Sequence, residues 1–398
     1  MKLYTSKLAA DANAIVVDDM ILTEEVPTAA GSKMLEGYVS LFEAEVLTRL
    51  KKNGYSIGGK ASVGEFAIDL VGETAYNNLC AEDGKLVNAS AQILKNNEAK
   101  AVVGLDVNGS VRRAAAQNAL VSVKPTYGRV SRYGTIPVVC SGETVSVMAT
   151  KVADCKEVLA AIDGYDEKDG TSQPGEMREQ LAKDAATAKK KVALLKSMTA
   201  GIDEEVAAKM QKFSAMLTAQ GVEVCEIESD VIAAARMAWN VLMCAELCNN
   251  VSRYDGVKFG YRTENFTNLD ELYTNSRTEA FGELLKTAIL YGSEALSTDN
   301  YMKVYDKALR VRRVIVEAFA ALFKEYDAVL MPACSAMAYT EEQVKANKYI
   351  AFEENFYTAP ASITGLPAVV VGGIQLVGKA FSEDVLFDMA EMYEREGK

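Results

Sequence analysis

The sequence predicts an α/β protein with a mixed, largely parallel sheet and helices on both faces. Short apolar runs typical of buried strands alternate with helical segments along most of the chain. We find no internal repeat, no low-complexity segment and no obvious linker. These observations predict a single domain over residues 1–398, with a helical middle section at about 230–325.

The N-terminal half supplies the first predicted strands. Residues 1–30 are expected to be irregular apart from one strand at 14–17, and a Ser-x-x-Glu capping box at Ser40 to Glu43 predicts a helix that ends at Gly54. Apolar patterns further predict strands at 55–60, 101–107, 120–123 and 144–150, helices at 88–99, 110–119 and 152–162, and a loop at 124–134.

The C-terminal half repeats this alternation around longer helices. Its first segment, 165–190, is charged and is expected to be a solvated connection with a helix. The pattern then predicts strands at 191–195, 222–227, 327–332, 368–373 and 374–379, and helices at 203–220, 230–253, 269–292, 299–325 and 387–395.

Composition excludes several functions. The chain contains no histidine, so neither a Ser-His-Asp triad nor a His-ligated zinc site is possible. A formal net charge of −12 argues against direct binding of nucleic acid. Seven scattered cysteines, no apolar run of 18 residues and no apolar leader favour a cytoplasmic protein with no membrane span.

The stretch from Gly104 to Arg112 is the candidate for chemistry. An apolar strand runs into an Asn-Gly turn, and Ser110 follows at the start of a helix. Ligands of α/β sheets bind at the carboxyl ends of strands, and the N–H groups that begin a helix can stabilise an oxyanion. Ser110 is therefore a candidate nucleophile, which without histidine would need a lysine or another base. The alternative interpretation is a helix-capping serine.

Several segments carry a family resemblance. The run Val123 to Gly134 (VKPTYGRVSRYG) resembles the stretch after the signature of amidase-signature enzymes, with the closest match to the A subunit of the glutamyl-tRNA(Gln) amidotransferase. Similar matches extend over nearly the whole chain, at Ala30 to Val39, Gly59-Lys60 with Glu65 to Ala67, Ser252 to Val257, Gly260 to Arg262, Thr364 to Pro367 and Gln375 to Lys379. The resemblance implies the amidase-signature fold.

The resemblance also implies amide hydrolysis by a Ser-cis-Ser-Lys triad with no cofactor. In that device a lysine acts through a bridging serine to deprotonate the nucleophile. Ser110 matches the nucleophile position, and Gly109 matches the preceding glycine. Val107 replaces a threonine and Asn108 replaces a glycine in the oxyanion loop. The nucleophile position is thus retained within an altered loop.

The other two triad positions are replaced. Asp18 stands at the position of the lysine base, where its negative charge would disfavour a serine alkoxide. Counting back from Ser110 places Leu86 at the bridging serine, and leucine has no proton to relay. Three positions that would recognise glutamine also differ, since Trp239 replaces a tyrosine, Ala288 an arginine and Asn355 an aspartate. Their loss removes charge-assisted contacts to both ends of an amino acid.

We interpret the chain as a degenerate homologue of this A subunit, without catalytic activity and with an assembly or regulatory role. Its expected partners are other amidotransferase-like subunits. One alternative is an active amidase of altered specificity that uses Ser110 with Lys60 or Lys85 as a new base. Another is a protein that binds a small ligand in the old pocket. Cys244 and Cys248, four residues apart, are read as buried thiols rather than a metal site.

Overall fold

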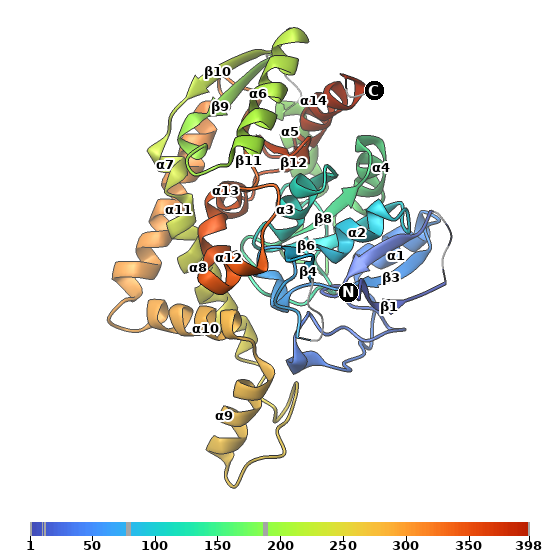
Figure 1. Ribbon diagram of the computed structural model, residues 1–398, viewed down its shortest axis with the longest axis vertical. Helices are drawn as coiled ribbons and strands as arrows, with labels where there is room; N and C mark the ends of the chain where they lie inside the picture. The colour runs from blue at the N-terminus through green and yellow to red at the C-terminus, as the bar shows by residue number, and fades with distance from the viewer. Residues whose placement is uncertain (1, 10, 12, 77–80, 186–189, 397–398) are drawn as a thin grey trace.

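The fold is built around one large mixed sheet (Figure 1). The computed structural model describes residues 2–9, 11, 13–76, 81–185 and 190–396. Within these ranges, eleven strands form the sheet, and a separate two-stranded hairpin joins β4 (Ala81–Glu82) to β5 (Lys85–Leu86). In spatial order the strands of the large sheet are β1 (Tyr4–Lys7), β3 (Ile57–Ala61), β2 (Ile15–Asp18), β6 (Ala101–Asp106), β8 (Thr144–Ala149), β7 (Val121–Lys124), β12 (Ala368–Val371), β13 (Ile374–Gly378), β11 (Ala328–Pro332), β9 (Lys191–Leu195) and β10 (Glu223–Ile227).

The expected mixed sheet is confirmed, but it is not largely parallel. Parallel pairs join β3, β2 and β6 near one end and β11, β9 and β10 at the other, whereas the pairs between β6 and β11 are antiparallel. Short connections explain the difference. β12 and β13 are joined only by Gly372 and Gly373, and a turn of this length can link only antiparallel neighbours.

Helices cover both faces of the sheet, as the sequence predicts. Along β2 and β6, Val16 and Val102 pack against α2 (Ala89–Lys95) and α3 (Ser110–Gln117), in one apolar cluster. Their neighbours Val17 and Val103 belong to a second, larger cluster on the other face. Successive side chains of a strand point to opposite faces, so this alternation places each residue. The second cluster packs beneath α1 (Glu45–Lys52), α4 (Val152–Ile162) and α14 (Glu383–Glu396).

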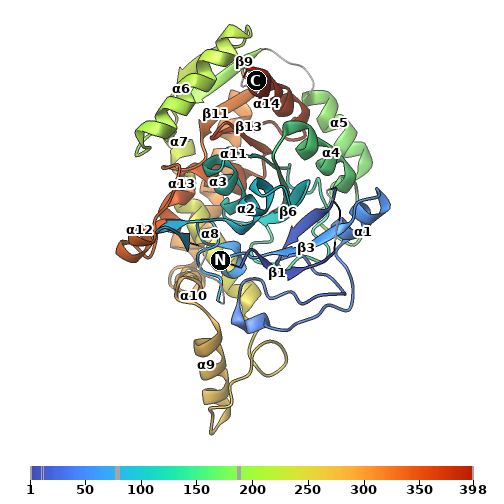
Figure 2. The ribbon, with the colours of Figure 1, turned by 45° about the vertical axis from the view of Figure 1, so that its right-hand side comes forward.

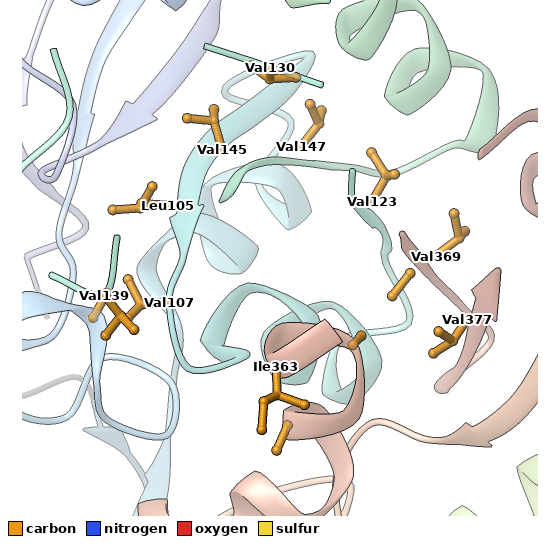
Figure 3. Close-up of a cluster of buried hydrophobic side chains, with 14 of the residues drawn as sticks. Leu105, Val107, Val123, Val130, Val139, Val145, Val147, Ile363, Val369 and Val377 are labelled. Carbon is orange, nitrogen blue, oxygen red and sulfur yellow. The ribbon is translucent and has the colours of Figure 1, made fainter. Parts of the chain in front are cut away.

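Valine side chains form much of this larger cluster near the centre of the sheet. Figure 3 shows Leu105 beside Val145, Val107 beside Val139, and Val123 beside Val147. All are buried. Burying aliphatic side chains of this size is worth about 1.5–3 kcal/mol each. The strand that leads to Ser110 is therefore held on a rigid apolar base.

The remaining helices lie mostly beyond the central strands, and among them α8 and α13 are largely buried. α5 (Gly175–Ala185) has no buried residue among those described, in agreement with a solvated segment. Figures 1 and 2 both show α9 projecting away from the body. These helices are α6 (Glu204–Ala219), α7 (Asp230–Ala233), α8 (Ala235–Val251), α9 (Leu269–Ala280), α10 (Glu283–Leu296), α11 (Asp306–Leu322), α12 (Glu341–Ala346) and α13 (Ile350–Thr364), with a π-helical turn η4 (Tyr301–Tyr305) before α11.

Tertiary contacts overrule two helix predictions. The helix predicted from the capping box begins only at Glu45, because the N–H of Ala44 bonds the Leu22 carbonyl and that of Glu45 bonds the Tyr133 carbonyl. The helix predicted over 269–292 breaks at Phe281 and Gly282. There the N–H of Gly282 donates to the carboxylate of Glu65, which is distant in the sequence, at 2.8 Å. No local pattern carries these contacts.

Among the described strands and α-helices, β1, the β4–β5 hairpin, α12 and α13 were not anticipated from the sequence. Pro360 lies inside α13 and interrupts its helical signal. One helical stretch, Asp230–Val251, has the length and hydropathy of a membrane span, but 56% of its apolar window is buried in the fold. It packs against α10, α11 and α13 as a core helix does.

Candidate functional site

The turn between β6 and α3 is fixed by a fully buried ion pair. Arg112 Nε and Nη2 each donate to the Asp106 carboxylate at 3.0 Å, and Asp106 also accepts the N–H of Gly109 at 3.1 Å. Burial opposes ionisation of Asp106, but the guanidinium outweighs it and lowers the pKa of this carboxyl. The remaining guanidinium donors bond α13 and β13, at the Thr358 carbonyl, Ser362 Oγ and Gln375 Oε1.

Gly109 is required by the shape of the turn. Its φ is +86°, in the left-handed region, and a Cβ at this position would lie 2.4 Å from the Thr358 side chain. Thr358 Oγ1 also donates to the Asn108 carbonyl at 3.2 Å. Helix α13 therefore presses directly on the loop that presents Ser110, and the predicted strand, turn and helix are all present.

Ser110 faces a carboxylate across a very small cavity. Ser110, Asp18, Ser62, Asn88 and Ser90 line a space of about 20 Å³, which has room for about one water molecule. Among the described residues, the Ser110 hydroxyl has no hydrogen-bond partner, and no lysine lines the cavity. The nearest ionisable side chain on this cavity wall is therefore acidic.

Asp18 is held firmly in this position. Its carboxylate accepts the N–H groups of Leu105 at 2.7 Å and of Met20 at 3.0 Å. Burial nevertheless raises the pKa of Asp18 to about 6, with a further contribution from the neighbouring Asp19. A Cβ on Gly104 would lie 2.8 Å from the Asp18 carboxylate, so glycine is needed beside it. At neutral pH this wall of the cavity carries negative charge.

Lys60 points to the opposite face of the sheet. It pairs in register with Val17, whereas Asp18 pairs with Ala61. Its amine contacts Thr28 Oγ1, the Pro27 carbonyl at 3.2 Å and Asp19 Oδ1 at 3.5 Å. Burial lowers the pKa of Lys60 to about 8, against the opposing effect of its acidic neighbours. Lys60 is thus a buried lysine with its own partners, in a different cavity from Ser110.

Leu86 and Lys85 lie on the small β4–β5 hairpin. Leu86 is buried in the apolar cluster of α2 and α3, and its N–H bonds the Tyr339 carbonyl at 2.8 Å. It does not line the Ser110 cavity. Lys85 is exposed to solvent on the other side of the strand. Neither residue places a proton-transfer group beside Ser110.

Of the three expected glutamine-recognition positions, Trp239 contacts the turn, whereas Asn355 and Ala288 lie on neighbouring helices. Trp239 is fully buried on α8, and its Nε1 donates to Asn108 Oδ1 at 3.3 Å, while Asn108 Nδ2 donates to the Ile68 carbonyl. Asn355 lies one helical turn before Thr358 and bonds Asn240 at 2.6 Å. Ala288 is buried on α10, which packs against α8. Val107 is buried in the larger apolar cluster.

Sequence reasoning missed the long-range partners of the turn. Thr358, Ser362 and Gln375 are separated from it by about 250 residues of chain. The four-residue spacing of Thr358 and Ser362 on one helix face is the only local signal. Cys244 and Cys248 are free thiols on α8, and burial raises the pKa of both.

Comparisons with known proteins agree with this architecture. The family model described as Amidase matches residues 14–79 and 90–387. The interval between these matches, 80–89, contains the β4–β5 hairpin and Leu86. Leu86, the expected position of the bridging serine, therefore lies outside the matched residues.

Two curated relatives share about a third of their residues with this chain, and both are the A subunit of a glutamyl-tRNA(Gln) amidotransferase. That of Clostridium botulinum strain Langeland is 32% identical, over 95% of this chain and 82% of the relative. That of Latilactobacillus sakei is 33% identical, over 96% of this chain and 82% of the relative.

Solved structures extend the likeness to the whole fold. The A subunit of the glutamyl-tRNA(Gln) amidotransferase from Thermotoga maritima has a TM-score of 0.79 at 25% identity, over 99% of this chain and 87% of that one. The urea amidolyase of Kluyveromyces lactis has a TM-score of 0.80 at 22% identity, over 96% of this chain and 23% of that much longer one, and shows the fold alone. With strand order, turn and family match in agreement, this chain belongs to the amidase-signature family.

Proposed function

We propose that this chain is a non-catalytic homologue of the amidotransferase A subunit with an assembly or regulatory role. The observation that carries the proposal is that Ser110 shares a cavity of about 20 Å³ with Asp18 and with no lysine. A serine nucleophile needs a base that removes its proton, and a neighbouring carboxylate raises the cost of forming an alkoxide. The cavity also has no room for an amide substrate.

Two further contacts support the same conclusion. Trp239, at the position where the resemblance implies a tyrosine of the glutamine pocket, is fully buried, and its indole donates to Asn108 in the turn itself. Asn355, at the expected ammonium-binding position, is bonded to Asn240 and carries no charge. Selective binding of an amino acid requires ionic partners for both of its charged ends, and the expected positions hold the uncharged residues Ala288 and Asn355.

The alternatives find less support. An active amidase of altered specificity would need Lys60 or Lys85, but the amine of Lys60 lies across the sheet and Lys85 is exposed on a hairpin. A protein that binds a small ligand beside Ser110 would need a far larger cavity than this one. The net charge of −12 makes direct binding of tRNA by this chain unfavourable, so a partner would have to bind the tRNA.

The test is ammonia release from glutamine and a panel of simple carboxamides. We would compare the purified chain with Ser110→Ala and with Ser62→Ala, which removes another hydroxyl from the same cavity. A catalytically active glutamyl-tRNA(Gln) amidotransferase complex serves as the positive control. We expect all three forms of this chain to release no ammonia above buffer. Turnover that is lost in Ser110→Ala and kept in Ser62→Ala would overturn the non-catalytic assignment.

The assembly role is tested by the size of the native protein. The chain has a mass of 43.0 kDa, so sedimentation in clarified extract of its own source separates a free chain from a complex. We expect most of it to sediment as a heteromeric particle. If it sediments as a free chain over the full range of extract concentrations, the assembly role is wrong.

A further inference from the structure

An open groove between helices is lined mainly by apolar side chains. It has a volume of about 580 Å³ and lies where α8, η4, α11 and α13 meet, on the left of Figure 1 and away from the N-terminal strands. The groove is far larger than the space beside Ser110. Its apolar lining includes Met237, Val241, Val304, Val311 and Phe352.

The rim of this groove is basic, although the whole chain is acidic. Arg236, Lys303 and Lys307 line it, against a single carboxylate from Glu353. Within the part of the chain that the structure describes, none of these three cations forms an ion pair with a carboxylate. A cluster of uncompensated positive charge on a protein of net charge −12 selects an anionic occupant.

Large apolar side chains are exposed in the groove and beside it, since Met237 is a lining residue and Leu290 and Met302 adjoin lining residues in the sequence. Met237 on α8 is 71% exposed, Leu290 on α10 is 72% exposed and Met302 in η4 is 61% exposed. Exposed apolar patches of this kind mark interaction surfaces, and methionine adapts its shape to a partner. η4 is a π-helical turn, a distortion that occurs frequently at functional sites.

We propose that this groove binds an amphipathic helix of a partner protein whose polar face is acidic. The apolar residues of such a helix, spaced three and four apart, would cover Met237 and Phe352. Its carboxylates would pair with Arg236, Lys303 and Lys307. The groove is open along its edges, which suits a helix better than a small molecule that must be largely enclosed. The proposal rests on the assembly role proposed above and specifies the partner surface.

The test uses designed helical peptides as probes. The first is an 18-residue fluorescein-labelled peptide with leucine at helical spacing and glutamate elsewhere. The second replaces every glutamate by lysine, and the third has the first composition in an order without a helical apolar face. Fluorescence anisotropy measures each affinity. We expect only the first peptide to bind, and its affinity to fall as salt rises.

Variants on the protein locate the site. We expect Met237→Glu and the double variant Lys303→Glu/Lys307→Glu each to weaken binding at least tenfold. All three residues lie at the surface, so circular dichroism should show unchanged folding. The matched control is Met177→Glu/Lys183→Glu on α5, where both side chains are also exposed. This control should bind the peptide as the unmodified chain does.

Several outcomes would overturn the proposal. Equal affinity of the groove variants and the unmodified chain would place the peptide elsewhere, and equal affinity for the lysine peptide would remove the charge argument. Binding of sodium decanoate, but not of the acidic peptide, would identify a site for small carboxylates. Self-association that Met237→Glu abolishes would identify a second copy as the occupant. None of these results alters ammonia release, so this proposal and the non-catalytic assignment fail separately.

Discussion

Two polar side chains at the turn between β6 and α3, Asp106 and Ser110, differ sharply in their hydrogen bonding. Asp106, at the end of β6, pairs with Arg112 on α3. Together their hydrogen bonds connect β6, α3, α13 and β13. After the turn, the Ser110 hydroxyl faces Asp18 and makes no hydrogen bond to any described residue. A buried ion pair cannot lose one member without leaving an uncompensated charge, whereas removing a hydroxyl that makes no hydrogen bond leaves no charge unpaired. The hydrogen bonds that hold the turn in place are therefore made by Asp106 and Arg112 and do not involve the Ser110 hydroxyl.

Breaking the buried ion pair between Asp106 and Arg112 should have the largest effect on the free energy of unfolding. We expect Arg112→Met to destabilise the protein by about 3–5 kcal/mol, because it leaves the buried Asp106 carboxylate unpaired. Urea unfolding followed by circular dichroism measures the change. Arg313→Met removes an exposed pair with Glu317 on α11 and should cost less than about 1 kcal/mol. Similar losses in both variants would contradict the structural role of the buried pair.

The carboxylate opposite Ser110 should make stability depend on pH. The pKa of Asp18 rises from 3.8 to about 6 in the folded state, so the folded protein holds this proton more tightly than the unfolded chain. The resulting stability is complete below pH 3.8 and is lost as pH rises to about 6, by about 3 kcal/mol.

Asp18→Asn should remove this part of the slope. The measurement is urea unfolding at several values between pH 4 and pH 6, with Asp388→Asn at an exposed position of α14 as the control. Parallel curves for the unmodified chain and Asp18→Asn would show that Asp18 does not titrate in this range.

The conformation of the turn can be tested separately from its charges. Gly109→Ala places a Cβ at positive φ against Thr358 and should destabilise the protein by about 2 kcal/mol. Gly84 has a φ of +74° with open space around it, so Gly84→Ala carries only the backbone cost, about 1 kcal/mol. Thermal unfolding distinguishes the two. If both variants lose the same stability, the contact with Thr358 is unimportant.

The smallest effect is expected at Ser110. Ser110→Ala should change the free energy of unfolding by less than about 0.5 kcal/mol, since the hydroxyl has no hydrogen-bond partner among the described residues. Ser131 is a buried serine that does bond, to Asp166 at 2.6 Å, and Ser131→Ala should cost about 1–3 kcal/mol. A large loss in Ser110→Ala would mean that the serine still stabilises the fold.

Local patterns predicted most of the fold and the position of the turn. Strand β6, the Asn-Gly turn and α3 all lie where apolar runs and turn residues place them. The balance of parallel and antiparallel pairs was predicted wrongly, because strand direction depends on connections and neighbours far apart in sequence. The break at Gly282 and the bonds from Arg112 to α13 are also long-range, and no local pattern contains them.

The tight space beside Ser110 has a consequence for experiments on motion. A reagent larger than water cannot reach residue 110 unless β6, α2 and their neighbours separate. The rate at which residue 110 is modified therefore measures how often these elements open locally. A chain carrying Ser110→Cys would report these openings through thiol labelling above the background of its native cysteines. The cavity beside Ser110 would then report local unfolding around the turn between β6 and α3.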